Sequence, residues 1–388
     1  MAFPNDWSYR RKITISGSSG VGTGYQILLK IGESSGSSDY DFHLDNKSAK
    51  FPSQQDDGGD FRFTLDDGTT LLPLWVEKVE GTSPNRTAHI WVKVNADLST
   101  DQNIYIYFGN ANAENVSNGE ETFELFDDFD GSSLDSNKWI AHESVTISES
   151  ELFVSTGGSS YIPVRSKNTF DRNIAFVARA RASSYGDYTI SILWDDDDGN
   201  LNTYSEHSYL SSNGLYWRHC TSGKSDYLQY SLTPQSDVYY KLELRLTTTD
   251  IECYVDGNGA VNTNSDNSGS KYLGFDCYDG SAARYDWVLV RKYTVPEPVF
   301  NSVDNIELPH TLQGTVCDKN GNPITGTSVK IFLLDKDTGE LLGSTTSNSE
   351  DGSWSITTWS NKTLAVFALE GTYGEDTDIA GAEFLEVE

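Results

Sequence analysis

Short runs of alternating apolar and polar residues recur along the chain, separated by clusters of Gly, Asn, Asp and Ser. A period of two is typical of β-strands with one buried face, and no long segment shows the 3.6-residue period of an amphipathic helix. The clearest runs are rich in β-branched and aromatic residues and lie at 12–15, 90–94, 104–108, 239–246, 251–255 and 287–290. The pattern predicts an all-β protein.

Two changes of composition divide these predicted strands. A polar stretch at 115–124 precedes an acidic and aromatic segment at 125–131, and three prolines, Pro296, Pro298 and Pro309, mark a second boundary. Proline cannot donate to a central strand ladder, so 296–309 is predicted as an extended linker. Because 388 residues exceed what one core usually organises, we predict three β-sandwich domains in tandem: 1–122, 123–295 and 310–388.

The charge is strongly one-sided. With 58 acidic and 28 basic residues the formal net charge is −30, which repels nucleic acids and anionic membranes, so neither is a predicted partner. Excess carboxylate is typical of proteins from very salty habitats, where the screening length falls to about 3 Å at 1 M salt. We expect a halophilic source, with an ordinary acidic extracellular protein as the alternative.

The cysteine spacing and the first residues of the chain argue against several classes of protein. The four cysteines show no CxxC spacing, which argues against the usual zinc and redox motifs. Cys253 and Cys277 fall on predicted neighbouring strands, where they either pair or remain buried thiols. The first residues lack the basic and apolar regions of a signal peptide, and no run of 18 apolar residues follows, so no membrane insertion is expected.

The first predicted domain carries four ordered signatures: WSYRRKI at 7–13, DFRF at 60–63 with LPLWVE at 72–77, IWVKV at 90–94, and IYIYFGN at 104–110. Together they resemble an uncharacterised β-sandwich family of archaeal, bacterial and viral surface proteins. The alternation of aromatic and polar residues places Trp75 and Trp91 in a sandwich core rather than in a ligand site.

The second predicted domain begins with DDFDGSSLD at 127–135 and ends with YDWVLVRKY at 285–293. These ends resemble those of a concanavalin-type or laminin-G-like jelly roll, in which they form adjacent strands. Several relatives bind a structural calcium there, so the resemblance implies Asp128 and Asp286 as calcium ligands, since calcium favours carboxylate oxygens. The alternative is that both carboxylates are solvated or cap turns.

Some proteins that resemble this domain cleave polysaccharides. Retaining glycosidases need two carboxyl groups about 5–5.5 Å apart, which those relatives place on one strand as Glu-x-Asp-x-x-Glu. The chain has no such motif; its nearest acidic runs are DDDDGN at 195–200, a predicted hairpin turn, and DIE at 250–252. We therefore predict no enzymatic activity.

A jelly roll without catalytic residues can still bind a glycan. Sugar sites combine aromatic faces with a few convergent polar groups in a concave surface. Side chains of this kind fall on consecutive predicted strands and are the candidate ligand-binding residues: Trp194, Tyr204, His207, Tyr209, Trp217 and His219. The alternative is that the rings fill the core and the histidines are structural.

The last predicted domain carries LQGTVCDKNGNP at 312–323, VKIFL at 329–333, DTGELLG at 337–343 and DGSWSI at 351–356. It is similar to the small transthyretin-like or carboxypeptidase-regulatory-like β-sandwich, an Ig-like module that spaces or attaches other domains. No residue in it suggests catalysis.

These modules are typical of exported proteins, whereas the start of the chain shows no export signal. A virion component resolves this, because it reaches the outside by assembly. We predict a non-enzymatic structural or attachment protein (tail fibre, spike or capsid turret) on the virion surface of a virus of a halophilic archaeon. Its expected partners are host-surface glycan or glycoprotein, other virion proteins, and copies of itself in a homo-oligomer, by analogy a trimer. The alternatives are a cell-surface adhesin or S-layer-associated protein, and a polysaccharide-cleaving enzyme with a divergent site.

Overall fold

The chain is built almost entirely of β-strands in the computed structural model. The described residues are 3–141, 145–155, 164–182, 188–194, 205–220, 224–263, 270–277, 282–318, 320–335, 339, 341–359, 364–369 and 379–385. Their only helix is α1 (Gly119–Thr122), one turn capped by the Asn118 side chain. None of the described helical structure is long and apolar enough to cross a membrane. The predicted all-β class is confirmed.

The first sandwich consists of two packed sheets, with strand orders β24-β1-β8-β4-β5 and β3-β2-β7-β6. The strands are β1 (Tyr9–Ser16), β2 (Tyr25–Gly32), β3 (Phe42–His43), β4 (Arg62–Leu65), β5 (Leu71–Leu72), β6 (Leu74–Glu80), β7 (Thr87–Val94), β8 (Gln102–Phe108) and β24 (Val299–Val303). Alternate residues of these strands, such as Ile13, Leu29, Ile90 and Ile106, are fully buried in the core between the sheets.

The strand β24 comes from far along the chain. It pairs antiparallel with β1, with Ile13 opposite Val303 and Ile15 opposite Phe300, and both Phe300 and Val303 pack against the first core. The predicted linker over 296–309 is therefore corrected, because residues 299–303 contain no proline and form an edge strand of the first sandwich. The chain leaves this sandwich after β8 and returns to it as β24, so the second sandwich is an insertion into the first.

The inserted domain is a jelly roll of two larger sheets, ordered β10-β13-β22-β15-β16-β17-β18 and β11-β12-β23-β14-β19-β20-β21. Its strands are β9 (Leu125–Asp127), β10 (Trp139–Ala141), β11 (Thr146–Ser148), β12 (Glu151–Ser155), β13 (Val164–Phe170), β14 (Ile174–Ala182), β15 (Tyr188–Trp194), β16 (Ser205–Ser211), β17 (Gly214–Cys220), β18 (Lys224–Ser231), β19 (Tyr240–Leu246), β20 (Asp250–Val255), β21 (Asn258–Thr263), β22 (Lys271–Cys277) and β23 (Ala282–Lys292). The first strand, β9, pairs with the last, β23, as the resemblance implied. Cys253 and Cys277 lie on β20 and β22, in different sheets rather than on neighbouring strands.

The first sandwich and the jelly roll are joined by a second apolar cluster. Strand β7 is buried at seven of its eight positions, which indicates that its sheet is covered on both faces. We call the covering cluster the aromatic joint; it comprises Trp75, Trp91, Phe123, Phe126, Ala175, Val177, Trp287, Leu289 and Tyr293. The rings of Trp75 and Trp287 meet edge to face with their centroids 5.3 Å apart, so the two domains share a packed core.

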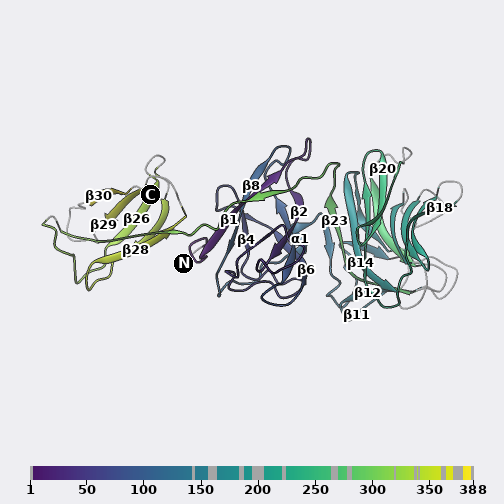
Figure 1. The fold of residues 1–388 in the computed structure, drawn as a ribbon, viewed down its shortest axis with the longest axis horizontal. Helices are drawn as coiled ribbons and strands as arrows, with labels where there is room; N and C mark the ends of the chain where they lie inside the picture. The colour runs from purple at the N-terminus through teal and green to yellow at the C-terminus, as the bar shows by residue number, and fades with distance from the viewer. Residues whose placement is uncertain are drawn as a thin grey trace.

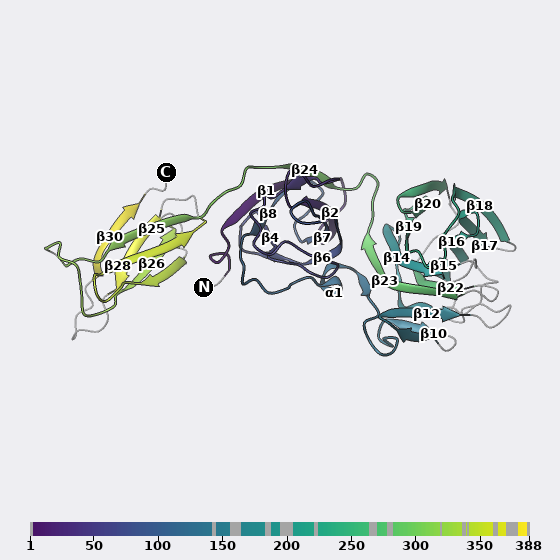
Figure 2. The same ribbon diagram turned by 60° about the horizontal axis from the view of Figure 1, so that its bottom comes forward.

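The C-terminal sandwich lies at the opposite end of the molecule from the jelly roll, with the first sandwich between them (Figure 1, Figure 2). Its strands are β25 (His310–Thr315), β26 (Lys330–Asp335), β27 (Leu341–Thr346), β28 (Ser353–Thr358), β29 (Leu364–Leu369) and β30 (Ile379–Leu385). Trp359, 8% exposed, inserts beside the first sandwich, where its ring lies 5.4 Å from that of Tyr107. Arg10 lies over the same indole at 4.8 Å, which fixes this contact by a cation–π interaction.

Replacing Trp359 with alanine should loosen the C-terminal sandwich. The variant loses the contacts to Arg10 and Tyr107 but keeps the core of the C-terminal sandwich, in which Trp359 takes no part. We expect limited proteolysis between residues 304 and 310 to become at least several-fold faster. Ser355→Ala, an exposed change on β28, is the control. Equal cleavage rates for both variants would mean that Trp359 does not hold the two domains together.

Candidate functional site

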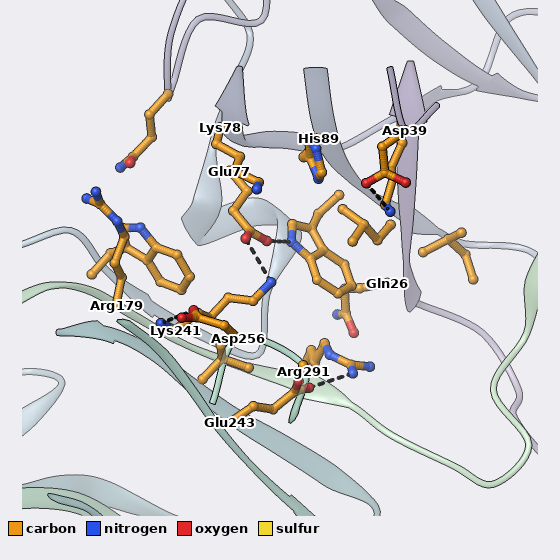
Figure 3. Close-up of a pocket in the computed structure, with 18 of the residues that line it drawn as sticks. Gln26, Asp39, Glu77, Lys78, His89, Arg179, Lys241, Glu243, Asp256 and Arg291 are labelled. Atoms are coloured by element: carbon orange, nitrogen blue, oxygen red, sulfur yellow. Dashed lines mark hydrogen bonds and ion pairs between the residues drawn. The ribbon is translucent and has the colours of Figure 1, made fainter. Parts of the chain in front are cut away.

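A cleft of about 1010 Å³ lies beside the aromatic joint, between the first sandwich and the jelly roll. One wall comes from β2, β6 and β7, the other from β14, β19 and β23, and residues 297–300 also line it (Figure 3). Ligand sites occur preferentially at domain interfaces in hollows of this size. This cleft is therefore the candidate functional site.

The jelly-roll wall is charged because of the alternation along β19. Lys241, Glu243 and Arg245 alternate with three leucines that fill the jelly-roll core. Successive side chains of a strand point to opposite faces, so the three charged groups all face the first sandwich. On β23 the same alternation places Trp287 and Arg291 on the cleft side.

Glu77 is the centre of the opposite wall. It lies at a β-bulge of β6, between the pairs that Val76 and Lys78 make with β7; bulges commonly redirect a side chain toward a site. Glu77 is 6% exposed; it accepts a hydrogen bond from Trp91 Nε1 at 2.8 Å and one from Lys241 Nζ at 2.9 Å. Burial opposes its ionisation, but Lys241 and Trp91 hold its pKa below the usual range. This ion pair crosses from one domain to the other.

A second ionic cluster lies deeper in the jelly-roll wall. Arg291, 3% exposed, donates to Glu243 at 2.9 Å and to Glu297 at 2.5 Å. Arg245 also donates to Glu243, at 2.9 Å. Burial alone would raise the pKa of Glu243, but Arg291 and Arg245 lower it to about 2. Tyr25, on β2 of the first sandwich, donates to Glu297 at 2.7 Å, so this cluster too spans both domains.

The rim of the cleft is more exposed. Lys30 pairs with Asp39 at 2.8 Å, and Lys78 pairs with Glu80 at 2.9 Å. On the jelly-roll side, the guanidinium of Arg179 lies 3.8 Å from the centre of the Tyr239 ring. Figure 3 shows Arg179, Lys78 and Asp39 around the paired groups at the centre of the cleft.

The ionised groups of the lining balance one another. Its six cationic side chains are Lys30, Lys78, Arg179, Lys241, Arg245 and Arg291, and its six carboxylates are Asp39, Asp41, Glu77, Glu243, Asp256 and Glu297. Glu77 and Glu243 are both held ionised by cations, so neither can donate a proton near neutral pH. These two carboxylates are therefore ion-pair and hydrogen-bond acceptors rather than general acids.

Neither of the two predicted calcium ligands, Asp128 and Asp286, lines this cleft. Asp286 is on β23, where it forms an ion pair with Arg179, a partner that it would have to give up to bind calcium. The carboxylate of Asp128 accepts a hydrogen bond from the backbone of Asp130 at 3.3 Å. Among the described residues there is no group of three or more His, Cys, Asp or Glu arranged to hold a metal. The calcium site stays a prediction.

The predicted ligand-binding residues lie on the other sheet of the jelly roll and do not all share a face. Trp217 on β17 belongs to the core and stacks on Tyr227 with ring centroids 5.0 Å apart; the ring of His219 lies 5.8 Å from that of Trp217. Tyr209 on β16 pairs with Tyr216, while Ser208 pairs with Trp217, so Tyr209 points to the opposite face. Their ligand role stays a prediction. Trp194 and His207 are on β15 and β16, but their side chains, like the whole of Tyr204, lie outside the described residues.

The structure adds an apolar surface that sequence analysis missed. Tyr227, Leu228 and Tyr230 on β18 are 48%, 52% and 39% exposed, and Val261 on β21 is 57% exposed. The two strands are joined by a hydrogen bond from Asn262 to Gln229 at 2.6 Å. We call these four side chains the tip surface, because β18 lies at the end of the molecule farthest from the C-terminal sandwich (Figure 1, Figure 2).

A comparison with protein families matches part of the first two domains. The family model is described as a domain of unknown function (DUF2341) and matches residues 57–142, less than a quarter of the chain. The matched range runs from the loop before β4 through β10, and it includes three of the four signatures of the first sandwich. No curated protein matches the chain.

The chain is similar in part to solved structures of carbohydrate-active proteins. One comes from work on endo-acting O-glycanases of the human gut microbiota (12% identity, TM-score 0.37, covering 44% of this chain and 100% of that chain). A second is a β-1,3-1,4-glucanase, or lichenase, derived from a mouse hindgut metagenome (14% identity, TM-score 0.36, covering 43% and 98%). A third is the carbohydrate-binding module CBM66 from Bacillus subtilis (12% identity, TM-score 0.35, covering 41% and 98%). At such identities and TM-scores these similarities assign no function to the chain.

Proposed function

We propose that this chain is a non-enzymatic attachment protein that presents its jelly roll to a host or neighbouring surface. The observation that carries the proposal is the position of the tip surface. Among the described residues, four exposed large apolar side chains lie on β18 and β21, with Tyr227 and Tyr230 on one face of β18 and Leu228 on the other, at the far end of a row of three sandwiches (Figure 1). Exposed apolar groups that gather in one place are typical of an interaction site.

The joint between the first two domains supports the same function. The jelly roll is connected to the first sandwich by two chain crossings, by the aromatic joint and by the ion pair between Glu77 and Lys241. A domain fixed in this way already has a defined orientation. It therefore loses little conformational entropy when it binds a distant surface. The C-terminal sandwich is left free at the opposite end for attachment to a particle or a cell wall.

The chemistry of the tip surface favours a glycan or glycoprotein as the partner. Tyrosine rings bind the apolar faces of sugars and keep a hydroxyl for hydrogen bonding. Beside them, Arg218 forms a bidentate pair with Asp226 at 2.6 and 3.1 Å, and Tyr209 stacks on Tyr216 with ring centroids 5.3 Å apart. With a net charge of −30, binding would be strongest at high salt, where repulsion from acidic surfaces is screened.

We further propose that the chain is a virion component of a virus of a halophilic archaeon and acts as a homo-oligomer. The acidic composition and the row of attachment modules support this assignment, while a cellular adhesin is the alternative. Immunogold electron microscopy with an antibody against the chain distinguishes them. Labelling of particles supports the virion assignment, and labelling confined to cell envelopes would refute it.

The tip surface is tested by a double variant, Leu228→Ser with Tyr230→Ser. In molar NaCl we expect the wild-type chain to bind intact host cells and the variant to bind at least about tenfold more weakly, since two apolar contacts of an interface centre are lost. Leu341→Ser, a change of an equally exposed leucine (57%) in the C-terminal sandwich, is the matched control. Equal binding by the double variant and the control would exclude the tip surface as the attachment site.

A further inference from the structure

We propose that the cleft between the first sandwich and the jelly roll is a second binding site, and that its ligand is a neutral, hydroxyl-rich molecule, a short oligosaccharide. Such a site is distinct from the tip surface, because none of the four tip side chains lines the cleft. The inference rests on three properties of the cleft: its unsatisfied donors, its balanced charge, and its size and lining.

Unsatisfied donors are concentrated in the cleft. Buried side-chain nitrogens without a hydrogen-bond partner occur among the described residues of the lining. Three are obligate donors: Trp287 Nε1, Arg245 Nε and Arg291 Nε. Trp287 and Arg291 are 1% and 3% exposed. Leaving a buried donor without an acceptor costs about 1–3 kcal/mol, so the cleft gains from a ligand that brings acceptor oxygens.

The charge of the lining selects against charged ligands. Six cations face six carboxylates in a chain whose net charge is −30. Most of these groups are already engaged, as in the pairs of Glu77 with Lys241 and of Glu243 with Arg291. An ionic ligand would have to break such a pair and leave a buried charge without a partner, which is costly. Hydroxyl and ring oxygens supply acceptors without this cost.

The size and remaining lining fit an oligosaccharide. The volume of about 1010 Å³ is at the upper end of the range for ligand pockets, about 300–1,000 Å³, and is larger than a single sugar ring needs. Gln26, Gln54 and Gln55 add planar amides that donate and accept, and Tyr239 adds an aromatic ring. The side chains of Lys78 and Arg179, 45% and 37% exposed, lie at the rim of the cleft.

The test uses the full chain in molar NaCl and isothermal titration calorimetry. The probes are four neutral trisaccharides (maltotriose, cellotriose, mannotriose and tri-N-acetylchitotriose) and one acidic probe, trigalacturonic acid. We expect at least one neutral probe to bind and the acidic probe to bind at least about tenfold more weakly. Failure of every neutral probe, or tighter binding of the acidic one, overturns the proposal.

Variants locate the binding. Gln54 is an exposed residue of the cleft, so Gln54→Trp should fill the opening and weaken binding at least about tenfold without unfolding the chain. Gln313→Trp makes the same change at an exposed position of β25 and should leave binding unchanged. Trp287→Phe keeps a ring but removes the Nε1 donor, and should also weaken binding. Binding that survives both Gln54→Trp and Trp287→Phe refutes a cleft site.

The tip variant separates this proposal from the attachment function. Leu228→Ser with Tyr230→Ser should weaken cell binding at least about tenfold and retain the trisaccharide, whereas Gln54→Trp should weaken trisaccharide binding and retain cell binding. If the tip variant also loses the trisaccharide, the sugar binds at the tip and the cleft proposal fails. If the wild-type chain binds the trisaccharide but no cell surface, the attachment function fails and the cleft site stands.

Discussion

Replacing Trp75 with alanine is expected to cost about 3–5 kcal/mol and to separate the jelly roll from the first sandwich. Trp75 is fully buried, and its ring contacts Phe123, Phe126 and Trp287 with centroids 5.6, 5.0 and 5.3 Å away. Removal of so large a buried side chain leaves a cavity that a packed core refills only in part. Small-angle X-ray scattering should show a broader distribution of domain orientations, and urea denaturation a lower midpoint.

The control for this change is Trp354→Ala in the C-terminal sandwich. Trp354 packs against the core of that sandwich without joining two domains, so the variant should destabilise its own domain and leave the scattering of the joined pair unchanged. If Trp75→Ala and Trp354→Ala broaden the distribution of orientations equally, the aromatic joint is not what couples the domains.

Replacing Arg291 with methionine is expected to cost about 3 kcal/mol, because Glu243 and Glu297 lose a buried partner. Arg218→Met removes an exposed pair with Asp226 and should cost no more than about 1 kcal/mol. The double variant Arg291→Met with Glu243→Leu should recover part of the loss, since Glu243 no longer remains as a buried charge without Arg291, but not all of it, because Arg245 and Glu297 each lose a partner. Equal stabilities for Arg291→Met and Arg218→Met in urea denaturation would contradict the buried network.

The same variant should shift the acid sensitivity of the chain. The folded pKa of Glu243 is lowered from 4.5 to about 2, so its ion pairs stabilise the fold above the unfolded pKa. That stability is lost as the pH falls from about 4.5 to about 2. Without Arg291 the folded pKa of Glu243 rises, and the stabilising contribution of this carboxylate shrinks or is reversed. We therefore expect acid unfolding of Arg291→Met to begin at a higher pH than that of the wild type, as measured by tryptophan fluorescence.

The local pattern was sufficient to predict the strands. The alternation at 104–108 and 239–246 predicted what became β8 and β19, because side-chain direction in a strand depends only on position. The pairing of β9 with β23 followed from the resemblance of residues 127–135 and 285–293 to the ends of a known fold. In both cases the information lay within a few residues of the element predicted.

Contacts between distant segments could not be predicted in this way. The pairing of β24 with β1 joins Ile13 to Val303, about three quarters of the chain length apart, and nothing in residues 299–303 indicates that partner. The polar face of β19 carries Lys241, Glu243 and Arg245 and has the pattern of a solvated strand face. Alternation alone cannot reveal whether another domain covers that face. The cleft was missed for this reason. Its lining joins the charged residues of β19 to the buried Trp91 of the first sandwich.

The two chain crossings into the jelly roll have a consequence for how such molecules diversify. They run side by side: the backbone N–H of Glu124, just before β9, donates to the carbonyl of Val290 near the end of β23 at 2.9 Å. A gene segment encoding the whole jelly roll could therefore be exchanged for another at two spatially adjacent cut points. The recombinant would carry a different jelly roll while the first and C-terminal sandwiches remained as they were.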